Sequence, residues 1–167
     1  NSTTLSVKAP TPVKGSIKLR HPSWAAKVGG KVNGRRVKTK AGNDGYITLS
    51  RTWRDGDRIE MTLDMSLRLE PLPGDATQAD LFYGPVLLAG DLGTEGMQAP
   101  APHSDPALYN DYYTYDYGIP EHLKTATLDT STLQQTVPLR WQTPTGITVT
   151  PLYDLHRTRH VIYWHLP

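Results

Sequence analysis

The chain has 167 residues, no cysteine, and a formal net charge of +2 from 18 basic and 16 acidic residues. The missing cysteine excludes disulfides, thiolate-bound zinc and a cysteine nucleophile, and the mild, mixed charge predicts neither nucleic acid nor a membrane as a partner. The chain starts without Met, lacks signal-peptide features and has no apolar run of about 18 residues. We therefore expect a piece of a longer protein.

Alternation of polar and apolar residues predicts strands in the first part of the chain, because successive side chains of a strand point to opposite faces. The alternating segments are Ser16–Arg20, Gly45–Leu49 and Arg58–Leu63. Asn33-Gly34 and Asp55-Gly56 lie beside such segments, and both dipeptides tolerate the positive φ angles of tight turns. We predict a hairpin at each dipeptide.

Beyond residue 70 the predicted strands are separated by Gly and Pro. Pro71–Gly74 breaks the pattern, because proline cannot donate to a central ladder, and Ala79–Gly90 predicts an apolar strand pair interrupted at Gly84-Pro85. From Asp91 to about Pro120 the composition indicates a long loop or linker. Strands resume at Val137–Trp141, Ile147–Tyr153 and His160–His165, the last with Val161, Tyr163 and His165 on one face and Ile162 and Trp164 on the other.

Many short strands separated by Gly and Pro favour an all-β fold over a helical or α/β fold. We predict an antiparallel, jelly-roll-like β-sandwich over residues 1–92. A Pro- and Tyr-rich loop or linker should follow over residues 93–124. A smaller C-terminal β unit over residues 125–167 should then pack on the sandwich.

Six segments, in order along almost the whole chain except about residues 94–133, carry a resemblance to a known family. Together they resemble the C-terminal region of bacterial beta-L-arabinofuranosidases, enzymes of glycoside hydrolase family 127 and its relatives. An ordered set of six is more specific than any one of its short motifs. The segments are Leu19–Ala25 (LRHPSWA), Val32–Gly34 (VNG), Tyr46–Asp57 (YITLSRTWRDGD), Leu69–Pro73 (LEPLP), Tyr83–Asp91 (YGPVLLAGD) and Pro151–Trp164 (PLYDLHRTRHVIYW).

The resemblance implies β-sandwiches that follow a catalytic (α/α)6 barrel. In that family the barrel carries the chemistry, with a zinc-bound cysteine as nucleophile and glutamates nearby, and no such cysteine exists in this chain. We therefore expect a non-catalytic accessory domain whose partner is the barrel of the same parent polypeptide. The resemblance suggests a periplasmic or secreted bacterial setting.

The residues themselves predict no catalytic, metal or cofactor site. A glycosidase needs two carboxylates about 5 to 10 Å apart across a cleft, but the acidic residues here lie mainly in turns, and no pair stands out. His156 and His160 are four residues apart, which suits a metal on a helix but not in an extended strand. The four tryptophans are expected to be core or edge anchors rather than sugar platforms: Trp24, Trp53, Trp141 and Trp164.

The best candidate for ligand binding is the Tyr-rich segment near residue 112. Aromatic faces stack on sugars while Asp side chains accept hydroxyl hydrogen bonds, and loops often carry such sites. A carbohydrate-binding module for arabinose-containing plant cell-wall glycans is therefore the alternative function, although the segment could instead be pinned on the sandwich or face the absent barrel. The candidate residues are Asp111, Tyr112, Tyr113, Tyr115, Asp116 and Tyr117.

The hypotheses predict different surfaces. An accessory structural module should expose an apolar patch when isolated. A carbohydrate-binding module should expose a row of aromatic rings. An autonomous enzyme is disfavoured by the missing cysteines and carboxylate pair.

Overall fold

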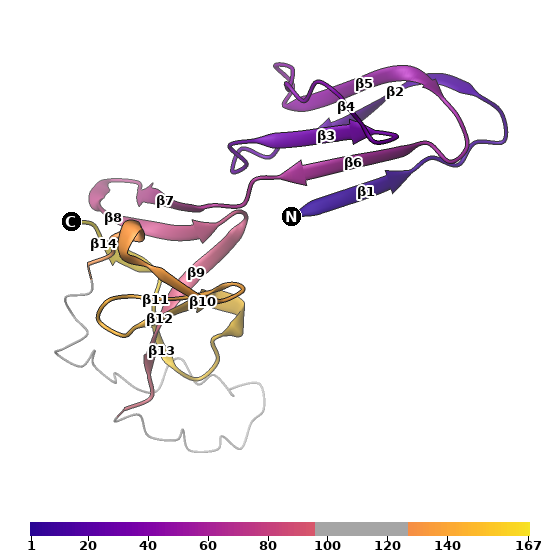
Figure 1. Cartoon of the computed structure of the whole chain (residues 1–167). Helices are drawn as coiled ribbons and strands as arrows, with labels where there is room; N and C mark the ends of the chain where they lie inside the picture. The colour runs from indigo at the N-terminus through magenta and orange to yellow at the C-terminus, as the bar shows by residue number, and fades with distance from the viewer. Residues whose placement is uncertain (96–126) are drawn as a thin grey trace, which may run out of the picture. The chain divides into compact units, whose positions relative to one another are not determined.

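The computed structural model describes residues 1–95 and 127–167 of the chain. The chain divides into two compact units, Asn1–Ser66 and Leu67–Pro167, which are called the N-terminal and C-terminal units below (Figure 1). Strands make up nearly all of the described secondary structure in both units, and the named strands of the described ranges pair antiparallel with one another. The predicted all-β class is confirmed. No helix in the described ranges is long and apolar enough to cross a membrane.

The N-terminal unit contains two sheets, seen as separate layers in Figure 1. Its first sheet has the order β1-β6-β3-β4, and its second sheet is the pair β2–β5. The register of the pair places Ile17 opposite Leu49 and Leu19 opposite Ile47, so these apolar residues share one face. The strands are β1 (Ser2–Ser6), β2 (Val13–Arg20), β3 (Val28–Val32), β4 (Arg35–Arg36), β5 (Tyr46–Trp53) and β6 (Arg58–Leu63).

The core of this unit draws on both sheets. Val32 and Ile59 from the first sheet are buried with Trp53 from the second. Ile17, Leu19 and Leu49 are among the partly buried residues that pack against them. Two small sheets therefore bury their apolar faces as a sandwich does.

The two predicted hairpin turns have different outcomes. Asn33 and Gly34 have φ angles of 51° and 76° and join β3 to β4 as a hairpin, as predicted. Asp55-Gly56 is a turn, with Gly56 at φ 79°, but the hairpin prediction there is wrong. β5 pairs with β2, whereas β6 pairs with β1 and β3. This turn carries the chain from one sheet of the sandwich to the other.

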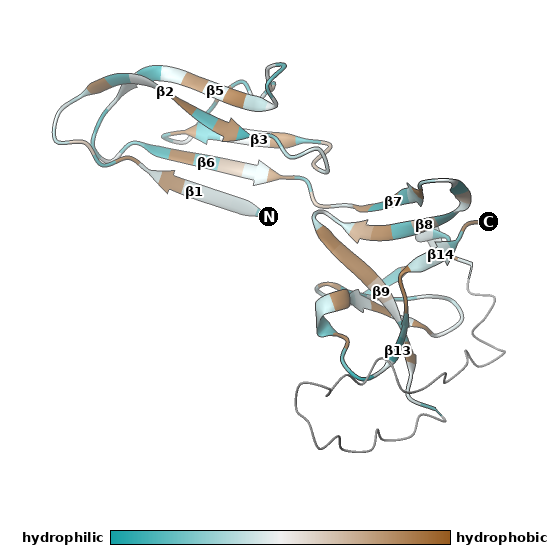
Figure 2. Cartoon of the chain, turned by 180° about the vertical axis from the view of Figure 1, so that it is seen from behind, coloured by the Kyte–Doolittle hydropathy of each residue, from teal (hydrophilic) through white to brown (hydrophobic). Residues whose placement is uncertain are grey.

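The C-terminal unit is built around one eight-stranded sheet with the order β10-β11-β12-β9-β8-β14. β13 also pairs with β9, and β7 pairs with β8. Figure 2 shows that β9 is apolar along most of its length. The strands are β7 (Leu67–Leu72), β8 (Asp75–Tyr83), β9 (Val86–Gly93), β10 (Gln134–Val137), β11 (Arg140–Gln142), β12 (Thr148–Pro151), β13 (Arg159–Val161) and β14 (Tyr163–His165), with short 3₁₀ turns η3 (Thr130–Thr132) and η4 (Leu152–Asp154).

Two predicted single strands near the end of the chain are each divided. The predicted strand over residues 137–141 is interrupted by a turn at residues 138–139 that joins β10 to β11, with Leu139 at φ 61°. Residues 160–165 change neighbours at Ile162, because β13 pairs with β9 and β14 pairs with β8. The predicted face of Val161 is wrong for this reason: Val161 and Trp164 both lie against Gly90 of β9, although simple alternation places them on opposite faces. Within β14 the prediction agrees with the structure, because Trp164 is buried between the exposed Tyr163 and His165.

The core of the C-terminal unit is centred on Trp164. This side chain is fully buried together with Leu81, Leu88 and Val149. Gly90 allows the close packing, since a Cβ at this position would lie 2.5 Å from Cη2 of Trp164 and 2.9 Å from Cγ1 of Val161. The indole therefore rests on bare backbone of β9.

The division of the chain differs from the expected boundary near residue 92. β8 and β9 pair with strands close to the C-terminus rather than with strands of the N-terminal unit. The two compact units therefore separate after Ser66. Most of the expected linker over residues 93–124 lies outside the described residues.

Candidate functional site

The Tyr-rich segment predicted to bind carbohydrate lies outside the described residues. This applies to every candidate in it: Asp111, Tyr112, Tyr113, Tyr115, Asp116 and Tyr117. Their role in carbohydrate binding therefore stays a prediction. The polar arrangements that follow come from the described residues.

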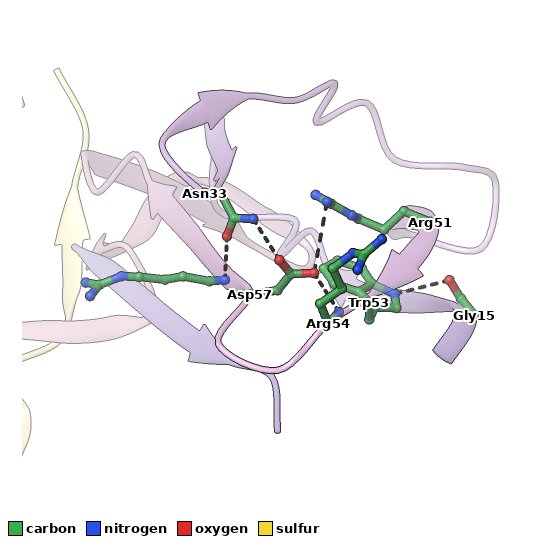
Figure 3. Close-up of polar contacts among 7 residues, drawn as sticks. Gly15, Asn33, Arg51, Trp53, Arg54 and Asp57 are labelled. Atoms are coloured by element: carbon green, nitrogen blue, oxygen red, sulfur yellow. Dashed lines mark hydrogen bonds and ion pairs between the residues drawn. The ribbon is translucent and has the colours of Figure 1, made fainter. Parts of the chain in front are cut away.

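The carboxylate of Asp57 joins two of the motifs singled out above (Figure 3). Nδ2 of Asn33 donates to Oδ1 of Asp57 at 2.7 Å, and the backbone N–H of Arg54 donates to Oδ2 at 2.9 Å. Oδ1 of Asn33 in turn accepts from the backbone N–H of Arg58 at 2.8 Å. The VNG turn is thereby fastened to the WRDGD turn.

Arg51 and Trp53 extend this cluster towards the second sheet. The Arg51 guanidinium lies 4.0 Å from Oδ2 of Asp57 and 5.3 Å from the centre of the Trp53 ring. Nε1 of Trp53 donates to the carbonyl of Gly15 on β2 at 3.1 Å, as Figure 3 shows. The cluster thus links both sheets through side chains and satisfies the polar end of a buried tryptophan.

The chemistry of Asp57 suits a structural role. The amide of Asn33, the N–H of Arg54 and the nearby guanidinium of Arg51 hold the pKa of Asp57 below its ordinary value. Only 6% of the residue is exposed. A carboxylate that is ionised, shielded and held by two hydrogen-bond donors is a poor general acid, because a general acid must carry a proton near the operating pH.

Three of the four tryptophans pack in the cores of the two units. Trp53, Trp141 and Trp164 are buried, and Trp24 is half-buried. The Trp141 ring also packs on Tyr83, with ring centres 5.1 Å apart. The prediction of core anchors is confirmed for Trp53, Trp141 and Trp164, and the role of Trp24 stays a prediction.

The structure brings together one carboxylate pair that the sequence analysis missed. Glu70 of β7 and Asp80 of β8 are direct cross-strand partners. The Arg68 guanidinium donates to Oε1 of Glu70 at 2.7 Å and stacks over the ring of Phe82. Oδ1 of Asp80 is buried and has no hydrogen-bond partner within the described ranges. Burial and the nearby Glu70 raise the pKa of Asp80.

An irregular register hid this pair from the sequence analysis. A simple hairpin centred on Pro73-Gly74 would not place Glu70 opposite Asp80. The register shifts between Pro71 and Leu72, which adds residues on the β8 side. Glu70 was expected on a solvent-facing side, and it is exposed.

We expect Asp80→Asn to raise the free energy of unfolding by about 0.5 kcal/mol at neutral pH, because it removes one of two like charges that face each other across strands. Because the pKa of Asp80 is higher in the folded state than in the unfolded chain, the destabilisation caused by its charge is absent below the unfolded-state pKa. It grows as pH rises through the folded-state value. Urea unfolding at acidic and neutral pH measures the difference.

Asp75 on the same strand provides the control. Its carboxylate accepts hydrogen bonds from Thr77 and Gln78, and these lower its pKa. Asp75→Asn should therefore destabilise the protein at neutral pH, the opposite sign to Asp80→Asn. Equal effects of both variants would contradict the assigned environment of Asp80.

Metal-binding geometry is absent from the described residues. Neither residues 1–95 nor residues 127–167 contain a group of three or more His, Asp or Glu side chains that could hold a metal ion. His160 instead places Nδ1 3.2 Å from the carbonyl of Thr158. His156 is exposed.

Comparison with known proteins gives a family match within the N-terminal unit. Residues 1–65 match the family model described as beta-L-arabinofuranosidase, GH127 middle domain. The predicted resemblance to the beta-L-arabinofuranosidase family is confirmed, whereas the predicted C-terminal position within that family stays a prediction. The VNG and WRDGD motifs joined through Asn33 and Asp57 both lie inside the matched residues. No match was found among curated proteins.

Solved structures share the fold over nearly the whole chain. A protein described as a glycoside hydrolase has 17% identity and a TM-score of 0.63, and covers 99% of this chain and 30% of its own. A GH127 beta-L-arabinofuranosidase from Geobacillus stearothermophilus has 15% identity and a TM-score of 0.63, and the match covers 99% of this chain and 28% of that protein. A GH127 beta-arabinofuranosidase has 16% identity and a TM-score of 0.63, and the match covers 99% of this chain and 30% of that protein. The chain thus spans about 30% of the length of these structures.

Proposed function

We propose that this chain is the non-catalytic accessory β region of a glycoside hydrolase that resembles beta-L-arabinofuranosidases, and that it supports the catalytic barrel of the same parent polypeptide. The observation that carries the proposal is the match of residues 1–65 to a GH127 middle domain. The solved GH127 chains with this fold are about three times longer, which leaves room for a barrel elsewhere.

The chemistry of the described residues supports the same proposal. The chain has no cysteine to serve as a zinc-bound nucleophile. Asp57, the most buried carboxylate in the described ranges, fastens two turns together. Three of the four tryptophans are buried in the cores of the two units. These features stabilise a β scaffold and contribute no reacting group.

The first test is an assay of the 167-residue chain on an aryl beta-L-arabinofuranoside. We expect no hydrolysis above the background rate, with or without added zinc. Hydrolysis that disappears in Glu70→Gln and Asp80→Asn variants would overturn the proposal, because these residues form the described cross-strand carboxylate pair.

A second test addresses the supporting role. The parent polypeptide should be compared with a version that lacks the residues of this chain. We expect the shortened protein to melt at a lower temperature and to lose soluble expression. An unchanged melting temperature together with unchanged activity would show that the barrel does not need this region.

The alternative function is a carbohydrate-binding module for arabinose-containing plant glycans, favoured by the five tyrosines over residues 109–117. Arabinan, arabinoxylan and hydroxyproline-linked arabino-oligosaccharides are the ligands to titrate, with Tyr and Trp fluorescence as the signal. Saturable binding that disappears when Tyr112, Tyr113, Tyr115 and Tyr117 are all replaced by Ala would support the alternative. The absence of binding would favour the accessory role. Plant glycans lie outside the bacterial cell, so either function fits a periplasmic or secreted setting.

A further inference from the structure

The small net charge of the chain conceals two units of opposite sign. The N-terminal unit carries 13 basic and 5 acidic residues, a formal charge of +8. The C-terminal unit carries 5 basic and 11 acidic residues, a formal charge of −6. The N-terminal unit alone therefore has the electrostatic character of a protein that attracts anions.

The positive charge of the N-terminal unit is concentrated around β3 and β4. Residues 27–40 contain six basic and no acidic side chains. All six are exposed, and none is within ion-pair distance of a carboxylate in the described ranges. They are Lys27, Lys31, Arg35, Arg36, Lys38 and Lys40.

Part of this segment lines a groove of about 290 Å³. Gly29 and Gly30 of β3 contribute backbone without side chains, and a Cβ on Gly30 would lie 2.7 Å from Cγ2 of Thr39. Thr39 also lines the groove, and its hydroxyl donates to the carbonyl of Val28 at 2.7 Å. This contact holds the chain that follows β4 against β3.

Two cations of the groove face each other across the hairpin. Lys31 of β3 is the direct partner of Arg36 of β4, and like charges in this position repel. Glu60 of β6 also lines the groove opposite Lys31, but its carboxylate is 3.2 Å from Nε of Arg58. A bound carboxylate would relieve the repulsion between Lys31 and Arg36, and the planar Arg36 guanidinium can bind it through two parallel hydrogen bonds.

The lining of the groove selects among anionic partners. It contains no aromatic residue, so it offers no stacking surface to nucleic acid bases. The exposed large apolar residues of this unit, Leu5 and Val13, do not line it, so it has no anchor for a membrane. Its volume lies near the lower limit for small-molecule pockets and suits about one sugar residue.

We propose that this groove and the surrounding cations bind the carboxylates of an acidic polysaccharide. One uronate residue occupies the groove between Lys31 and Arg36, while neighbouring carboxylates meet the other exposed cations of residues 27–40. This site is independent of the accessory role proposed above and of the Tyr-rich segment. Its ligand differs from neutral arabinose glycans by its charge.

The test uses the 167-residue chain and polygalacturonate, with affinity gel electrophoresis and isothermal titration as measurements. We expect saturable binding that weakens as the salt concentration rises. Neutral arabinan should not compete. The variant Lys31→Gln/Arg36→Gln should bind about fivefold more weakly. The matched control is Lys8→Gln/Lys14→Gln, which removes the same charge from exposed residues of the same unit outside the groove.

Several outcomes would overturn the proposal. Equal weakening in both double variants would show an effect of net charge alone. Equally tight binding to duplex DNA or to anionic phospholipid vesicles would remove the assignment to polysaccharide. A third result would be self-association of the chain that weakens with salt and is lost in Lys31→Gln/Arg36→Gln, while polygalacturonate does not bind. That result would mean that the cations bind the acidic C-terminal unit of a second copy of the chain instead. Circular dichroism checks that both variants remain folded.

Discussion

Replacement of Trp164 by alanine is expected to lower the free energy of unfolding of the C-terminal unit by about 4 kcal/mol. The side chain is fully buried and packs with Leu81, Leu88 and Val149 in the largest described core. Its removal leaves a cavity that the two neighbouring strands cannot close, because Gly90 beneath it has no side chain to fill the space. Urea unfolding followed by far-ultraviolet circular dichroism measures the loss.

Tyr163→Ala is the matched control for this prediction. Tyr163 precedes Trp164 on β14 but is 50% exposed. Its replacement should change stability by less than about 0.5 kcal/mol. A comparable loss in both variants would mean that pairing of β14 with β8, rather than burial of the indole, is what the substitutions disturb.

The second large effect is expected at Asp57. We expect Asp57→Ala to lower the melting temperature of the N-terminal unit by about 8 °C, because it leaves the amide of Asn33 and the N–H of Arg54 without their acceptor. Differential scanning calorimetry gives the melting temperature. Amide signals in NMR spectra assign the transition to the N-terminal unit.

Asp55, two residues earlier in the same turn, is the control. Its carboxylate accepts one hydrogen bond, from the backbone N–H of Ala9 at 3.1 Å. Asp55→Ala should therefore lower the melting temperature much less. A double-mutant cycle with Asn33→Ala isolates the contact, and additive effects of Asn33→Ala and Asp57→Ala would exclude coupling between the two side chains.

The pH dependence provides a further check on Asp57. Its pKa is lower in the folded state than in the unfolded chain, so it contributes stability above the unfolded-state pKa. This contribution is lost as pH falls through the folded-state pKa. The melting temperatures of the wild type and of Asp57→Ala should therefore approach each other in acid.

Local patterns were sufficient to predict an individual strand and one tight turn. Alternation gave Arg58–Leu63 with both ends correct, and Asn33-Gly34 gave its hairpin because the two positive φ angles are a local property. Asp55-Gly56 has equally strong turn chemistry. Whether a turn closes a hairpin or crosses between sheets is decided by packing on both sides, which a dipeptide does not encode.

The same limit explains what was missed in the C-terminal unit. The final strand was predicted as one element, but β13 and β14 pair with different partners, so the alternation of faces restarts at Ile162. The pairing of Glu70 with Asp80 depends on a register shift that no motif announces. The opposite charges of the two units can be counted in the sequence, but only when the boundary after Ser66 is known.

Placement of Trp164 on the bare backbone at Gly90 also sets an order of events in folding. β8 can pair with β9 through a tight turn, but its pairing with β14 must wait until a loop of about 80 intervening residues has closed. Until then the strip of β9 at Gly90 has no cover, and Leu81 and Leu88 lack their largest neighbour. We therefore expect this core to form late in folding, and folding to be slow because the pairing of β8 with β14 joins distant parts of the chain.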